Sequence, residues 1–126
     1  MGTELALGAI GQISVTAHDL DRAVAFYRDV LGMKFLFPAG SLAFFDCNGI
    51  RLMLAVPDKK EFDHPSSIIY FKVPDIQKAH AALTERKVKV EEPPILVAKL
   101  EKFDLWLCSF RDSEGNLLAL MSEVAR

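Results

Sequence analysis

The sequence predicts an α+β fold in which two βαβββ modules form a curved, mostly antiparallel cup. Three observations predict it: the two halves of the chain repeat one another, a strand-like run precedes each helical pattern, and strong turn signals separate the later strands. The repeat is clearest where Asp19-Leu20-x-x-Ala23 superposes on Asp75-Ile76-x-x-Ala79 at an offset of 56 residues. We therefore expect modules at residues 8–57 and 66–124, joined by a charged, proline-bounded linker at 58–65 into one domain.

The first module begins with residues 13–17, which alternate apolar and polar side chains as a half-buried strand does. Asp19 is a suitable N-cap for the amphipathic helix that follows, and Gly32 ends that helix. Residues 35–37 and 42–46 are then predicted strands. Asn48-Gly49 is a strong hairpin signal, and it leads into a further strand at 50–56.

The second module repeats this order with weaker signals after its helix. Residues 68–73 are rich in β-branched and aromatic side chains, and Pro74-Asp75-Ile76 starts the second helix. Residues 103–110 and 117–122 are predicted strands on either side of a turn at 112–116. The segments Glu91-Glu92-Pro93-Pro94 and Asp58-Lys59-Lys60-Glu61 are interpreted as solvated loops.

Composition excludes several classes of protein. The 126 residues are 51% hydrophobic and 25% charged, which is typical of a globular domain. With 15 basic and 17 acidic residues the net charge is -2, so a nucleic-acid-binding surface is not expected. No apolar run is long enough to span a membrane, and no signal peptide is evident. Two cysteines, Cys47 and Cys108, are too few for a disulfide framework, which favours a reduced, cytoplasmic location.

Two motifs resemble one known superfamily, and together they extend over nearly the whole chain. The later motif is residues 110–116, Phe-Arg-Asp-Ser-Glu-Gly-Asn, which is similar to a Phe-x-Asp-Pro-Asp-Gly-Asn turn, with Ser113 and Glu114 as departures. The earlier motif is Ile13-x-Val15-x-x-x-Asp19-Leu20-x-x-Ala23-x-x-Phe26-Tyr27-x-x-Val30-Leu31-Gly32. Both resemble the vicinal oxygen chelate superfamily, which contains glyoxalase I, bleomycin-resistance proteins and extradiol dioxygenases. The resemblance implies a glyoxalase-like fold, a cup that binds small molecules, and a homodimer.

The resemblance also implies where a metal would be held. Enzymes of this superfamily bind a divalent ion with His and Glu side chains from the first and last strand of each module. Counting back from the helix-capping Asp residues and forward from the turn glycines gives the four corner positions: Gln12, Met53, Ile68 and Ala119. Catalytic metal sites usually need about three nitrogen or oxygen side-chain ligands, and this quartet offers one amide and one thioether. We therefore expect no metal and no other cofactor.

The cup would instead be apolar, with a few hydrogen-bonding groups. Strand alternation places Met53, Ile68 and Met121 on its face, where they fit core filling equally well, and Arg51 and Lys72 there fit rim positions. Trp106 and Cys108 share one face of residues 103–110, which alternation does not assign to the cup, and Trp106 also fits a dimer interface. If Arg51 or Lys72 faces inward, the ligand is expected to carry a carboxylate or phosphate. The candidate ligand-binding residues are Gln12, Ser14, Arg51, Met53, Ile68, Tyr70, Trp106, Cys108, Ala119 and Met121.

Three hypotheses for function follow. The first is a metal-free binding protein that holds a small apolar or aromatic molecule, with drug or toxin sequestration as one version. The second is an enzyme without a metal, in which His18, Arg51, Tyr70 or Cys108 assists the chemistry, although no spacing brings any pair together. The third is a metal-dependent lyase, isomerase or dioxygenase. Catalytic residues are not assigned, and the sequence leaves open whether the modules pair within one chain or across a dimer.

Overall fold

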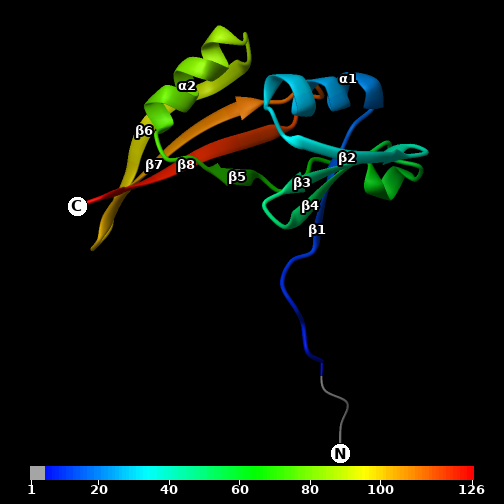
Figure 1. Cartoon of the computed structure of the whole chain (residues 1–126), viewed down its shortest axis with the longest axis horizontal. Coiled ribbons are helices and arrows are strands. Elements are labelled where there is room, and N and C mark those ends of the chain that lie inside the picture. The colour runs from blue at the N-terminus through cyan, green and yellow to red at the C-terminus, as the bar shows by residue number, and fades with distance from the viewer. Residues whose placement is uncertain (1–4) are drawn as a thin grey trace, which may run out of the picture.

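The computed structural model describes residues 5–126, which form two four-stranded mixed sheets with a helix on each (Figure 1). Each sheet comes from one half of the chain, with strand orders β1-β4-β3-β2 and β5-β8-β7-β6. The α+β class and the two-module organisation predicted from the sequence are therefore confirmed. The strands are β1 (Gln12–Thr16), β2 (Lys34–Ala39), β3 (Leu42–Cys47), β4 (Ile50–Ala55), β5 (Ile69–Lys72), β6 (Lys89–Lys99), β7 (Phe103–Arg111) and β8 (Leu117–Ala125).

The two helices begin in the same way. Asp19 caps α1 (Leu20–Ala25) and accepts a hydrogen bond from the Arg22 backbone N–H at 3.1 Å. Asp75 caps α2 (Ile76–Glu85) and accepts from the Lys78 backbone N–H, also at 3.1 Å. The offset seen in the sequence thus corresponds to structurally equivalent N-caps. A π-helical turn, Phe26–Val30, continues α1, and Gly32 follows with a φ of 72°.

Pairing within the sheets follows one plan in both modules. The first strand of each module runs parallel to the last, β1 against β4 and β5 against β8, and the other pairings are antiparallel. The β3–β4 connection is the hairpin expected from Asn48-Gly49, whose φ values of 50° and 96° suit a tight type I′ turn. The 60–62 segment between the modules is a short 3-10 turn.

One prediction is wrong: Glu91–Pro94 is not a loop but part of strand β6. β6 is the outer strand of its sheet, so the prolines, which donate no hydrogen bond, remove no pairing from a central strand. The register shifts between Val90 and Glu92 and again between Glu92 and Ile95, which are the irregularities that such a proline pair causes. An outer, bulged strand lacks the alternating pattern by which the other strands were predicted.

The core lies between the helices and the sheets and is continuous from one module to the other. Its largest fully buried side chains include Tyr27, Phe45 and Phe110. In Figure 1, α1 and α2 lie on the same side of the two sheets, which leaves the opposite face of each sheet open. Within residues 5–126, no helix is long and apolar enough to cross a membrane.

Candidate ligand-binding site

Burial along β4 shows which side chains face away from the helices. Leu52 and Leu54 are 2% and 0% exposed and belong to the core, whereas Arg51, Met53 and Ala55 alternate with them on the other side. We call this side of each sheet its open face. The alternation follows from the period of two in a strand, so the same argument assigns faces on the other strands.

The open face of the first sheet carries the larger groove, of about 810 Å³. Ser14 and Met53 line its floor, and their backbones are direct partners on β1 and β4. Phe62 and His64 from the linker form one wall, and Gly40 and Leu42 from the β2–β3 hairpin line it too. The groove therefore combines apolar side chains with hydroxyl groups.

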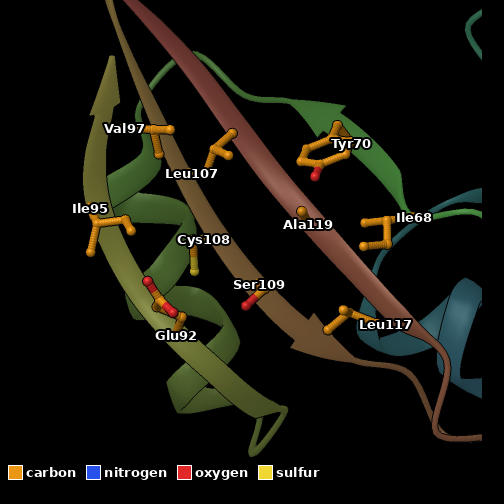
Figure 2. Close-up of a pocket in the computed structure, with 10 residues that line it drawn as sticks. All are labelled: Ile68, Tyr70, Glu92, Ile95, Val97, Leu107, Cys108, Ser109, Leu117 and Ala119. Carbon is orange, nitrogen blue, oxygen red and sulfur yellow. The ribbon is translucent and has the colours of Figure 1, made fainter. Parts of the chain in front are cut away.

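The open face of the second sheet carries a smaller pocket, of about 170 Å³, which Figure 2 shows. Tyr70 and Ala119 are paired across β5 and β8, and Ser109 pairs with Ala119 from β7. Ile68, the residue immediately before β5, also lines the pocket (Figure 2). Its remaining lining residues come mainly from the neighbouring strands: Glu92, Ile95, Val97, Leu107, Cys108 and Leu117.

Two of the predicted binding residues lie on the other side of β7. Cys108 pairs with Leu120, is 1% exposed and belongs to the core, although it borders the pocket. Trp106 is two residues away on the same face and packs against that core. Trp106 and Cys108 therefore lie on the helix-facing side of β7, whereas Leu107 and Ser109 occupy its open face. Met121 pairs with Leu107 on the open face, beside the pocket.

A third hollow, of about 470 Å³, lies between the two faces and is more polar. Here the His18 Nε2 atom is 2.8 Å from an oxygen of Asp63, and His64 lines the same hollow. No spacing in the sequence predicts that His18 and His64 line the same hollow. The signal that was missed is the linker, which returns across the end of β1, where the Thr16 hydroxyl is 3.4 Å from the His64 carbonyl oxygen.

Two of the open-face cations, Lys72 and Arg51, are held differently. The Lys72 ammonium is 2.7 Å from Glu123, a neighbouring carboxylate, so its charge is paired. The Arg51 Nε donates to the side-chain oxygen of Gln12 at 2.8 Å, and its guanidinium lies 5.0 Å from the centre of the Phe44 ring. Arg51 therefore lies on the open face beside Met53, and its side chain contacts Gln12 and Phe44.

The four corner positions do not fit a divalent metal. Gln12 and Met53 lie together, with 3.6 Å between the Gln12 amide nitrogen and the Met53 sulfur, but they supply one neutral oxygen and one thioether. Ile68 and Ala119 supply only carbon (Figure 2). Within the part of the chain that the structure describes, no three His, Cys, Asp or Glu side chains are placed to share an ion. The donor chemistry of these positions is thus unlike that of a Zn²⁺, Ni²⁺ or Fe²⁺ site.

The two modules are fixed to each other by a polar cluster at the turn 112–116. Asp112, only 6% exposed, accepts hydrogen bonds from the Tyr27 hydroxyl at 2.7 Å and from the Asn116 backbone at 2.8 Å. Burial and the nearby Asp112 charge raise the pKa of Tyr27. Glu114 accepts from the Arg22 side chain at 2.8 Å, and although burial opposes the shift, this and the other hydrogen bonds lower the pKa of Glu114. The cluster sets how the two open faces are placed.

Two βαβββ modules, each with an open face opposite its helix, define an architecture shared by a large class of small-molecule-binding proteins and enzymes. The chain matches the Glyoxalase/Bleomycin resistance protein/Dioxygenase superfamily over residues 9–120, and it belongs to that family. The resemblance inferred from its motifs is thereby confirmed.

Individual relatives agree with the fold. The chain is 40% identical to metallothiol transferase FosB of Lysinibacillus sphaericus over 48 residues, which is 38% of this chain and about a third (34%) of that protein. A lactoylglutathione lyase structure from Agrobacterium tumefaciens has 24% identity and a TM-score of 0.73, with 93% of this chain and 95% of that chain covered. A superfamily member from Sphaerobacter thermophilus has 22% identity and a TM-score of 0.79 over 94% and 100% of the chains.

Proposed function

We propose that this protein binds a small apolar or aromatic molecule in the cup formed by its open faces, without a metal. One observation carries the proposal: the four corner positions of an otherwise intact family fold hold Gln12, Met53, Ile68 and Ala119. A site with this donor set has lost the means to act as a Lewis acid, but it keeps the shape of a container. In one form of this function the protein sequesters a drug or toxic compound, which requires binding but no reaction.

The lining of the cup supports this proposal. Binding sites for small molecules are mostly apolar, with a few polar groups that fix orientation. Here Met53, Ile68 and Tyr70 supply apolar area, while Ser14 and Ser109 supply hydroxyl groups. Both cysteines are free thiols, which agrees with the proposed reduced, cytoplasmic location.

We also propose that the working form is a homodimer, in which a second copy covers the open faces. Several large apolar side chains of the open faces are exposed: Phe37 is 45%, Tyr70 48% and Val97 48% exposed. Apolar side chains that group on one face in this way often mark a protein–protein interface. The two open faces of one chain do not cover each other. A second copy with the same two faces supplies matching apolar surfaces by symmetry.

The test is a binding screen on metal-stripped protein. Thermal shift with a panel of small aromatic compounds and antibiotics is expected to find ligands, and isothermal titration is expected to give the same affinity with and without EDTA. Ser14→Trp fills the larger groove, on the open face of the first sheet, and is expected to abolish binding. Ala81→Trp, on the exposed side of α2, is the matched control and should bind normally.

Three outcomes would contradict the proposal. The first is that no compound of the panel binds the unmodified protein. The second is that binding disappears on chelation and returns with one equivalent of a divalent metal. The third is that Ser14→Trp binds as tightly as its control. Analytical ultracentrifugation of the same samples tests the dimer, and a monomer at concentrations where the ligand binds would exclude it.

A metal-free enzyme is a second candidate, favoured by the contact between His18 and Asp63. A carboxylate that holds an imidazole at 2.8 Å orients it for proton transfer, and the pair faces a hollow that also contains Thr16 and Asn116. Such a pair would suit a lyase or isomerase reaction that moves one proton. An activity panel with His18→Gln and Asp63→Asn tests this; His80→Gln, on α2, is the control. Turnover that survives both changes would exclude it.

A further inference from the structure

Arg51 differs from Lys72 and Arg111 on the open faces, because no salt bridge within residues 5–126 pairs its charge. Lys72 is paired with Glu123, and Arg111 lies 3.1 Å from Glu91. By contrast, no carboxylate within residues 5–126 lies within 4.0 Å of the Arg51 guanidinium. An arginine on the open face, two residues along β4 from the groove-lining Met53 and without a salt-bridge partner, is suited to an acidic ligand.

The surroundings hold this guanidinium in one orientation. Its Nε donates to the Gln12 side-chain oxygen at 2.8 Å, and its plane lies over the Phe44 ring at 5.0 Å. Across the part of the chain described by the structure, no hydrogen bond uses the two terminal nitrogens of Arg51. These are the atoms that bind a carboxylate in a bidentate manner.

The nearest candidate for an internal partner is already engaged. Asp46 is opposite Arg51 on β3, but its carboxylate accepts the Gly49 backbone N–H at 3.2 Å in the β3–β4 turn. That bond holds the carboxylate at the end of the hairpin. The guanidinium therefore remains available on the open face, two residues along β4 from Met53, which lines the groove.

We propose that the ligand of the cup is a small aromatic carboxylate, and that Arg51 binds its carboxylate group. The proposal rests on the proposed function and adds the chemical class of the ligand. Two aromatic rings lie on this face: Phe44, 5.0 Å from the guanidinium, and the more exposed Phe37, whose ring centre is 4.8 Å from that of Phe44. They supply a surface on which the aromatic body of the ligand packs while its carboxylate meets the terminal nitrogens.

Gln12 acts as a positioning residue in this arrangement. It stands at one of the four corners of the family's metal site, and here its amide holds the arginine at 2.8 Å and the Met53 sulfur at 3.6 Å. A fixed positive charge thus occupies the neighbourhood in which a metal-dependent relative would place its ion. Replacing the amide by a carboxylate would neutralise Arg51 from within.

The experiment compares matched acids and amides by isothermal titration against the full-length protein: benzoate with benzamide, and 1-naphthoate with 1-naphthamide. The acid is expected to bind about tenfold or more tightly than its amide, since a bidentate charged contact replaces a neutral one. Arg51→Gln and Gln12→Glu should each reduce that ratio to about one. Arg28→Gln removes an arginine that is paired with Asp29 on the first helix, and it is the control with an unchanged ratio.

The outcomes separate this inference from the proposed function. If acids and amides bind the unmodified protein equally, or if Arg51→Gln keeps the preference for acids, the carboxylate assignment is wrong while the cup remains a binding site. If no member of either series binds, the carboxylate assignment is wrong, and the wider compound panel decides separately whether the cup is a binding site. Circular dichroism of each variant shows whether it is folded, and Arg51→Lys keeps the charge without the bidentate geometry, so it should retain only part of the preference.

Discussion

The N-termini of the two helices are a natural comparison, because the sequence repeat makes them equivalent. Asp75 caps α2, and among the hydrogen bonds within residues 5–126 no side chain of the first module reaches the first turn of α2. At α1 the capping Asp19 has a second partner from the other module. Glu114 accepts the backbone N–H groups of His18 and Asp19 at 2.9 and 2.8 Å.

The turns before the last strand of each module differ in the same way. In the first module, Asp46 accepts a single hydrogen bond from Gly49. In the second, Asp112 accepts four, one of them from Tyr27 in the first module. The comparison shows that the duplicated modules diverged where one contacts the other. The second module supplies a buried acidic cluster that fixes the angle between the two open faces, and the first has no such cluster.

Removing the centre of that cluster is expected to have the largest effect. Asp112→Ala leaves the buried Tyr27 hydroxyl and the turn N–H groups without their acceptor, which should lower the free energy of unfolding by about 3–5 kcal/mol. Asp46→Ala, at the equivalent turn, loses one exposed hydrogen bond and should cost about 0.5–1 kcal/mol. Urea denaturation measures both. Equal losses would show that the two turns are equivalent after all.

Glu114→Gln tests the hydrogen bonds by which the ionised Glu114 clamps the start of α1. It should lower the free energy of unfolding by about 2 kcal/mol at pH 7. The pKa of Glu114 is lowered in the folded protein, so its charged form stabilises the fold above the unfolded pKa of about 4.3. This stabilisation is lost as the pH falls through the folded pKa. The difference between the variant and the unmodified protein should therefore shrink below about pH 4. A difference that stays constant from pH 7 to pH 3 would contradict an ionised clamp.

Local patterns in the sequence predicted most of the fold. Both N-caps, the Asn48-Gly49 hairpin and seven of the eight strands carry signals that depend only on neighbouring residues. The exception is β6, which was misread because Pro93-Pro94 usually marks a loop. Whether an edge strand tolerates prolines depends on what lies beside it, and that is a property of the assembled sheet.

The candidate site was less accessible to sequence reasoning. Alternation placed Gln12, Met53 and Ala119 on one side of their strands, but it gave Trp106 no absolute face. The contact of His18 with Asp63, and the position of Arg51 over Phe44, arise between segments far apart in the chain. Such contacts depend on how the linker and strands pack together, which no local pattern encodes.

Tyr27→Phe removes one member of the cluster and should cost about 1–2 kcal/mol, less than Asp112→Ala because Asp112 keeps its other donors. Burial raises the pKa of Tyr27, so its phenol stays neutral in the fold and ionises more readily when unfolded. Its contribution to stability should therefore fall as the pH rises above about 10. The difference in the free energy of unfolding between Tyr27→Phe and the unmodified protein should therefore be smaller at pH 10.5 than at pH 7. Divergence with rising pH would mean that Tyr27 is not protected by the cluster.

The smallest effect on stability is expected on the open faces. Val97→Ser changes a side chain that is 48% exposed and outside the polar cluster, so the free energy of unfolding of the isolated chain should change by less than about 0.5 kcal/mol. The same change removes apolar area from a face that a second copy is proposed to cover, so it should weaken the dimer. Sedimentation over a dilution series measures this, with Val24→Ser on α1, which packs against the core, as the contrasting variant. If Val97→Ser left the dissociation constant of the dimer unchanged, the open face would be an ordinary solvated surface. A face covered by a second copy should bind that copy more weakly when it loses apolar contacts.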